Sequence, residues 1–259
     1  MSMIKAVLWA SYKANRRRPL MSSIDQRSIA VPTELASWRK GMRAELIARR
    51  MAAPVLDRRN WSLAISLTLL HGLPWRDGLI VGFCWPYKGE YDARPLLRTL
   101  RQQGITCALP VVVQRSEPLL FRQWSPGVAM GTGPLGIAYP LGTAQVNPDL
   151  LLIPLVGFGR AGDRLGYGGG YFDRTLAALE PRPLGIGVGF ELCQLDSIFP
   201  QPHDVPMDAI VTEKCARWQA GGSLQEVTAQ QLRERLEDLV QVRAQMARLN
   251  AHTVPHSAL

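Results

Sequence analysis

The chain has 259 residues, of which 47% are hydrophobic, and a formal net charge of +9 at pH 7. A chain of this length and composition can bury a sizeable core, which excludes wholesale disorder. No run approaches the roughly 18 uncharged apolar residues that a membrane helix needs, so we expect no membrane span.

The positive charge is concentrated at the amino-terminal end. Residues 1–60 hold 13 Lys and Arg and 4 Asp and Glu, whereas residues 61–259 hold 17 of each kind. Residues 1–30 lack periodicity, and we interpret them as a flexible basic leader. A basic segment suits a phosphate-bearing ligand as well as a polymer, so an RNA-associated protein is an alternative. The confinement of the charge and the absence of an aromatic-rich RNA-binding motif disfavour nucleic acid as a partner.

The first predicted helix lies within residues 31–53, where Thr33 can cap its amino terminus and apolar residues recur at three- and four-residue steps. Arg39, Arg43 and Arg50 fall on another stripe of this helix. Periodicity by itself favours a solvated basic face for these arginines. A second helix is expected over residues 56–72, ending at Gly72.

Strand-like apolar runs then alternate with helical patterns. We expect strands at 78–85, 105–113, 119–124, 150–158, 183–190 and 208–212, and helices at 92–103 and 171–179. Asp92 is expected to cap the first of these helices. Runs that are apolar on both faces and separated by helices predict a mostly parallel sheet covered on both sides, a three-layer α/β/α sandwich.

A charge-rich helix is predicted from Thr228 to Asn250, with an apolar stripe that we expect to dock on the body. A coiled-coil partner face is the alternative. We therefore divide the chain into the leader (1–30), one α/β domain (31–222) and a helical extension with a tail (223–259), and expect a monomer or a weak dimer.

The cysteines and histidines are scattered along the chain and form no cluster with metal-ligand spacing. Widely separated thiols are typical of a reduced chain, so we expect a cytoplasmic protein.

The stretch "RLGYGGGYFDR", residues 164–174, is the most informative motif. It connects a buried strand to a helix, where backbone N–H groups and the helix amino terminus favour phosphate binding. Arg164 and Arg174 bracket the loop, and Asp173 could hold Mg²⁺ together with phosphate oxygens. The spacing matches neither a P-loop nor the dinucleotide-binding pattern.

The segment from residue 150 to residue 177 closely resembles the signature of the 5-formyltetrahydrofolate cyclo-ligase family, also called methenyltetrahydrofolate synthetases. Three further stretches match the family pattern in order, and the resemblance spans roughly Trp38 to Glu213. They are "RKGMR" at 39–43, "YKGEYDARPLL" at 87–97 and "HDVPMDAIVTE" at 203–213.

The resemblance implies an ATP- and Mg²⁺-dependent ring closure of 5-formyltetrahydrofolate to 5,10-methenyltetrahydrofolate, with release of ADP and phosphate. The formyl oxygen would be phosphorylated first, and the neighbouring 10-nitrogen would then displace the phosphate. Such chemistry needs positioning and charge neutralisation more than a protein nucleophile.

Carried over by position, the resemblance implies two ligand sites and one metal ligand. Arg164 and Asp173 would be catalytic, and Asp173 would lie at the metal. The folate would contact Glu90, Tyr171 and Phe172. The ATP phosphates would contact Arg39, Arg43, Arg164, Gly166, Tyr167, Gly168, Gly169 and Gly170.

Simpler structural roles remain open for several residues. Asp173 could cap a helix, Glu90 could be a turn residue, and His203 with Asp204 could fix a loop. The chain also departs from the family pattern at Leu135, Gly159, Asp163 and Phe172. A non-catalytic nucleotide- or folate-binding relative of the same fold is therefore an alternative.

Overall fold

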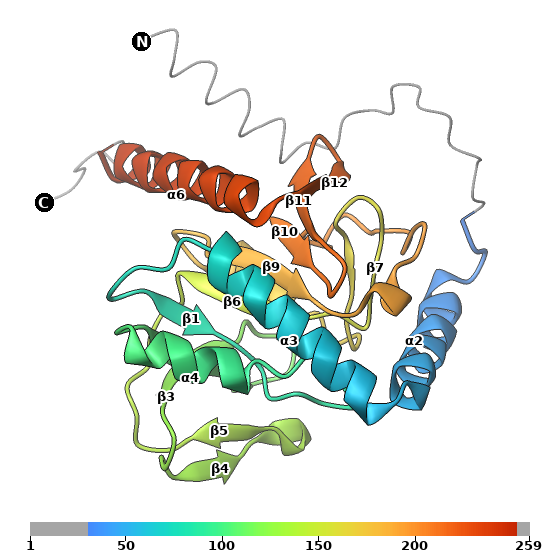
Figure 1. The fold of residues 1–259 in the computed structure, drawn as a ribbon, viewed down its shortest axis with the longest axis horizontal. Coiled ribbons are helices and arrows are strands. Elements are labelled where there is room, and N and C mark those ends of the chain that lie inside the picture. The colour runs from blue at the N-terminus through green and yellow to red at the C-terminus, as the bar shows by residue number, and fades with distance from the viewer. Residues whose placement is uncertain (1–30, 253–259) are drawn as a thin grey trace, which may run out of the picture.

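The computed structural model describes residues 31–252, so the leader expected at residues 1–30 and the tail at 253–259 lie outside it. The helices are α2 (Leu35–Ala52), α3 (Val55–Gly72), α4 (Arg94–Gln102), α5 (Tyr171–Ala178) and α6 (Ala229–His252) (Figure 1). The strands of the main sheet are β1 (Ile80–Gly82), β2 (Thr106–Val111), β3 (Leu120–Trp124), β6 (Leu150–Pro154), β9 (Leu184–Val188), β10 (Ala209–Val211), β11 (Ala216–Ala220) and β12 (Ser223–Val227).

The main sheet has eight strands in the order β12-β11-β10-β9-β6-β1-β2-β3. The five central strands, from β10 to β2, are parallel, and the outer strands β3, β11 and β12 are antiparallel. The predicted mostly parallel α/β fold is confirmed. The antiparallel hairpin of β11 and β12 was not predicted, because it lies on the sheet edge and lacks a long apolar run.

Helices cover both faces of the sheet, as the strand sequences require. In β6, Leu150 and Leu152 point into the core beneath α3, α4 and α6, while Leu151 and Ile153 point into the core beneath α5. Figure 1 shows α3 crossing one face of the sheet and α2 lying at its end. Among residues 31–252, no helix combines the length and the apolar character needed to cross a membrane.

Two short two-stranded ribbons stand outside the main sheet. One joins β4 (Met130–Thr132) to β5 (Ala138–Pro140), and the other joins β7 (Gly157–Phe158) to β8 (Arg164–Leu165). The second ribbon matters for function because it carries the chain from the end of β6 to the glycine loop.

The carboxyl-terminal helix docks on the body through α3, as expected, since Leu232 and Leu236 are fully buried. Thr228 and Gln231 form a reciprocal cap at its start, each side chain accepting the other's backbone N–H. The boundary expected after residue 222 falls at the turn between β11 and β12, so residues 223–227 form an edge strand of the sheet.

Two predicted caps have different outcomes. Asp92 accepts the backbone N–H of Arg94 at 3.1 Å and so satisfies the first amide of α4, but it lies one residue before the cap position, which Ala93 occupies. Thr33 does not cap α2, because the residue at the cap position is Glu34 and it makes no side-chain capping bond.

Candidate active site

The strand order reverses between β1 and β6, because β2 lies on one side of β1 and the later strands β6, β9 and β10 lie on the other. Open α/β sheets bind ligands outside the carboxyl ends of the strands at such a reversal. The loop after β1 contains Glu90, and the segment after β6 leads to the glycine loop. The topology therefore brings both predicted ligand segments to one place.

The glycine loop, residues 166–170, presents its backbone to solvent. Within residues 31–252, no acceptor pairs with the amides of residues 167–170. Gly168 has φ +95° and Gly170 has φ +64°, a backbone region that other residues rarely adopt. Helix α5 begins directly after Gly170, so its positive amino terminus faces the same way. Unpaired amides before a helix are suited to bind an anion.

Arginine side chains pack closely against this loop. Arg43 donates its Nε–H to the carbonyl of Gly166 at 2.7 Å, and Arg174 donates to the carbonyl of Gly169 at 2.7 Å. A Cβ on Gly168 would lie 3.3 Å from the guanidinium carbon of Arg43. The loop therefore needs glycine both for its backbone angles and for the approach of these side chains. Their charges surround the free amides with positive potential.

Arg164 and Asp173 form a buried ion pair at the base of the loop. Arg164 Nη2 lies 2.7 Å from Asp173 Oδ2, and Asp173 Oδ1 accepts the backbone N–H of Val205 at 3.1 Å. Asp173 makes no capping bond to α5, so the capping interpretation is wrong. The Nε of Arg164 is buried and has no hydrogen-bond partner among residues 31–252, and the Nη1 of the same guanidinium faces the loop, 3.3 Å from where a Cβ on Gly166 would lie.

Asp173 could hold a magnesium ion only together with oxygens from another molecule. Within residues 31–252, no three His, Cys, Asp or Glu side chains gather in a way that could hold a metal. Mg²⁺ usually takes one or two carboxylates and completes its shell with phosphate oxygens and water. Asp173, beside the unpaired amides of the glycine loop, fits that pattern.

Arg39, predicted to bind ATP, directs its guanidinium to the segment before β10. It donates to the carbonyls of Ile198 and Phe199 and to the carboxylate of Asp204 at 2.7 Å. Asp204 thus fixes a loop, which is the structural role that the sequence left open for it. Burial and, after it, the nearby charge of Arg39 lower the pKa of Arg43, so Arg39 lies close enough to act on the site.

Glu90 and Tyr167 come from different loops and meet. The Tyr167 hydroxyl donates to Glu90 Oε1 at 2.5 Å, and the backbone N–H of Tyr87 donates to Oε2 at 3.0 Å. Glu90 is only 8% exposed, and burial raises its pKa, although the bond from Tyr167 and the charge of Arg50 oppose this rise. The resemblance places Glu90 at the folate and Tyr167 at the ATP phosphates, so it does not predict this contact.

Arg50 is the residue that sequence reasoning missed. The predicted solvated basic face is wrong for it, because the residue is 2% exposed and donates to Tyr167 and to two backbone carbonyls. The available signal was its position on the same helical stripe as Arg39 and Arg43.

The aromatic pair after the loop contacts the arginines. The guanidinium of Arg174 lies 5.1 Å from the ring centre of Tyr171, and that of Arg164 lies 5.4 Å from the ring centre of Phe172. Phe172 therefore needs no hydroxyl for its contact with Arg164, since a ring face attracts a cation.

Of the other departures from the family pattern, two lie near the β7–β8 ribbon. A Cβ on Gly159 would make only ordinary contacts with the backbone of residues 197–198, at 3.4 Å or more, so the structure does not explain the glycine at this position. Asp163 is buried in the ribbon. Leu135 lies in a 3-10 turn, and the side chain of Leu135 is outside the described part of the structure.

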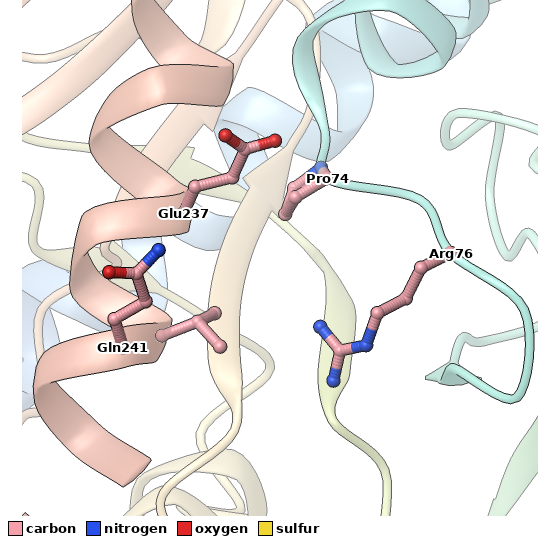
Figure 2. A pocket seen from close by; sticks show the side chains of 5 residues that line it. Pro74, Arg76, Glu237 and Gln241 are labelled. Carbon is pink, nitrogen blue, oxygen red and sulfur yellow. The ribbon is translucent and has the colours of Figure 1, made fainter. Parts of the chain in front are cut away.

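A shallow hollow lies elsewhere, between α6 and the segment joining α3 to β1 (Figure 2). Pro74 and Arg76 line one side of it, and Glu237, Val240 and Gln241 line the other. It adjoins the amino end of β1, the opposite edge of the sheet from the glycine loop, and so takes no part in the site.

Comparison with known proteins identifies the family. The model of the 5-formyltetrahydrofolate cyclo-ligase family matches residues 35–213. The 5-formyltetrahydrofolate cyclo-ligase of Haemophilus influenzae is 27% identical over 65% of this chain and 94% of its own length, and that of Escherichia coli is 36% identical over 49% and 73%. The solved 5,10-methenyltetrahydrofolate synthetase of Aquifex aeolicus is 29% identical, with a TM-score of 0.61 over 73% of this chain and 96% of its own. The chain therefore belongs to the 5-formyltetrahydrofolate cyclo-ligase family of enzymes.

Proposed function

We propose that this enzyme uses ATP and Mg²⁺ to close 5-formyltetrahydrofolate to 5,10-methenyltetrahydrofolate through a phosphorylated formyl group. The observation that carries the proposal is the pairing of two features at the strand-order reversal. Unpaired amides between arginines can bind phosphates, and a buried carboxylate joined to the same loop can orient a pterin.

The phosphates of ATP would accept hydrogen bonds from the backbone amides of residues 167–170. Arg43 and Arg164 would neutralise the charge that develops as the γ-phosphoryl group passes to the formyl oxygen. The unpartnered Nε of Arg164 supports this role, because a buried donor without an acceptor is costly unless a ligand supplies one. When bound, Mg²⁺ would neutralise phosphate charge beside Asp173.

The folate would be held by its pterin edge on Glu90, whose two oxygens can accept paired hydrogen bonds from adjacent N–H groups. The formyl oxygen takes the phosphoryl group, and ADP leaves. The 10-nitrogen then attacks the formyl carbon, its proton is lost, and the carbon–oxygen bond breaks to release phosphate. The residues named here orient and neutralise; none forms a covalent bond to the substrate.

Formation of the methenyl product, followed by its near-ultraviolet absorbance, tests the proposal. Purified protein with 5-formyltetrahydrofolate, ATP and Mg²⁺ should form the product, and omission of ATP or addition of a chelator should stop it. Asp173→Ala should abolish the reaction. Arg160→Ala is the matched control, because Arg160 is exposed and pairs only with Asp196 at the surface. Product formation without ATP would refute the proposal.

A further inference from the structure

Arg50 connects three loops at the carboxyl edge of the sheet. From α2, its Nε donates to the carbonyl of Lys88 at 3.0 Å, its Nη1 to the carbonyl of Leu155 at 3.0 Å, and its Nη2 to the hydroxyl of Tyr167 at 3.0 Å. These acceptors belong to the loop after β1, the loop after β6 and the glycine loop. A buried guanidinium is costly unless its donors are satisfied, and here each nitrogen has a partner.

The loop after β1 is held in an unusual conformation at this contact. Lys88 has φ +48° and Gly89 has φ +73°, so two successive residues lie in the left-handed region. A lysine persists there only where the surroundings determine its backbone. Arg50 binds the carbonyl of Lys88, two residues before Glu90, and so sets the direction in which Glu90 leaves the loop.

The same guanidinium reaches Glu90 through Tyr167. Its Nη2 lies 3.7 Å from Glu90 Oε1, and the Tyr167 hydroxyl accepts from Arg50 while donating to that carboxylate oxygen. Glu90 thus has a short hydrogen bond and a nearby buried cation on the same oxygen. Both favour the ionised carboxylate over the neutral acid.

We infer that Arg50 is a positioning residue for folate recognition, and that the Tyr167 hydroxyl is the link through which it orients Glu90. The inference rests on the proposed function, in which Glu90 binds the folate. On this inference Tyr167 contributes to both ligand sites: its backbone amide binds phosphate and its side chain acts at the folate.

Besides Arg50 and Tyr167, the groups of residues 31–252 that interact with the charge of Glu90 are the backbone N–H of Tyr87 and two buried thiols. The thiols of Cys84 and Cys193 lie close enough to interact with the charge of Glu90. Burial raises the pKa of Cys84 to about 12 and that of Cys193 to about 11, so both thiols stay neutral. The pKa of Tyr167 is raised by burial and by Glu90 itself. Of these groups, only Glu90 changes charge on the acid side of neutrality.

Tyr167→Phe is the sharpest test, because it removes one hydroxyl from a side chain that is 45% exposed and leaves the loop amide in place. We expect the KM for 5-formyltetrahydrofolate to rise about tenfold while the KM for ATP stays nearly constant. Loss of a bond that lowers the pKa of Glu90 should also move the acid limb of kcat/KM for the folate to higher pH. An unchanged folate KM, or an unchanged acid limb, would overturn the inference.

Arg50→Lys tests the three-acceptor contact of the guanidinium, because lysine keeps the charge but cannot bind three acceptors in a plane. Its folate kcat/KM should fall on the order of 100-fold. Arg49→Lys is the matched control, since Arg49 is exposed and pairs with Glu45 on the same helix; it should retain wild-type kinetics. Wild-type folate kinetics in a folded Arg50→Lys protein would contradict the inference. Absence of product from the wild-type enzyme would instead contradict the proposed function.

Discussion

Replacement of Arg164 by lysine tests the phosphate site most directly. The native guanidinium binds Asp173 with one nitrogen at 2.7 Å and holds a second, unpartnered donor in the buried base of the loop. A lysine ammonium can keep the contact with Asp173 but cannot offer the second donor in a fixed direction. Loss of one preorganised donor to developing charge costs about 2.7–4 kcal/mol in the transition state, or roughly 10²–10³ in kcat.

The stability of this variant should change much less than its activity. Asp173 keeps a cation and the N–H of Val205 as partners, so no buried charge is left alone. We expect the free energy of unfolding to fall by about 1 kcal/mol, the scale of the contact between the guanidinium and the Phe172 ring that lysine weakens. Urea denaturation measures this change, and the methenyl absorbance assay at saturating ATP measures kcat.

Arg160→Lys serves as the control in the same segment, because its side chain is 74% exposed and it should keep full activity. A folded Arg164→Lys enzyme whose kcat stays within about threefold of wild type would refute the reasoning, because no preorganised donor would then have been lost. A large loss of stability together with activity would also refute it, since the pair would then be mainly structural.

Two further changes act on the glycine loop and on the carboxyl-terminal helix. Gly168→Ala should cost roughly 1–2 kcal/mol of stability because of its φ of +95°, and should raise the KM for ATP by displacing Arg43; an unchanged ATP KM would contradict this. Arg243→Met should lower the free energy of unfolding in urea by about 3 kcal/mol, since it removes a partner of the buried Asp208; a loss below about 1 kcal/mol would contradict this. Burial raises the pKa of Asp208, but Arg243 and Arg182 outweigh it and hold the pKa below its ordinary value. The ionised carboxylate therefore stabilises the native state above about pH 4, and this contribution is lost as the pH falls through the native pKa. The acid loss of stability should be shallower in Arg243→Met, and an equally steep loss would count against this account.

Much of the architecture could be predicted because it depends on local pattern. The runs at 150–158 and 183–190 are apolar on both faces, and only a sheet covered on both sides buries them. The helix from Thr228 carries its own cap and apolar stripe, so its position and docking face followed from the residues themselves. The glycine loop was recognisable because few uses other than a tight turn or an anion site need so many glycines.

The antiparallel edges were harder to predict. Strand β12 has polar residues at its exposed positions, and β11 buries the polar side chains of Arg217 and Gln219, so neither short sequence shows the apolar run that is typical of a buried strand. Pairing with β10 stabilises β11, and pairing with β11 stabilises β12, so the stability of each strand depends on a neighbour and not on its own sequence.

The sequence by itself determined the layered α/β fold, the position of the glycine loop and the resemblance to the family. Only the tertiary structure decided which arginine is buried and what each charge meets. Arg39 donates to Asp204, Arg43 to the glycine loop and Arg50 to Tyr167, although all three belong to one helix. Helical periodicity states which side chains share a face, but the segments that cover that face lie far along the chain, and their contacts set the charge and the direction of each group.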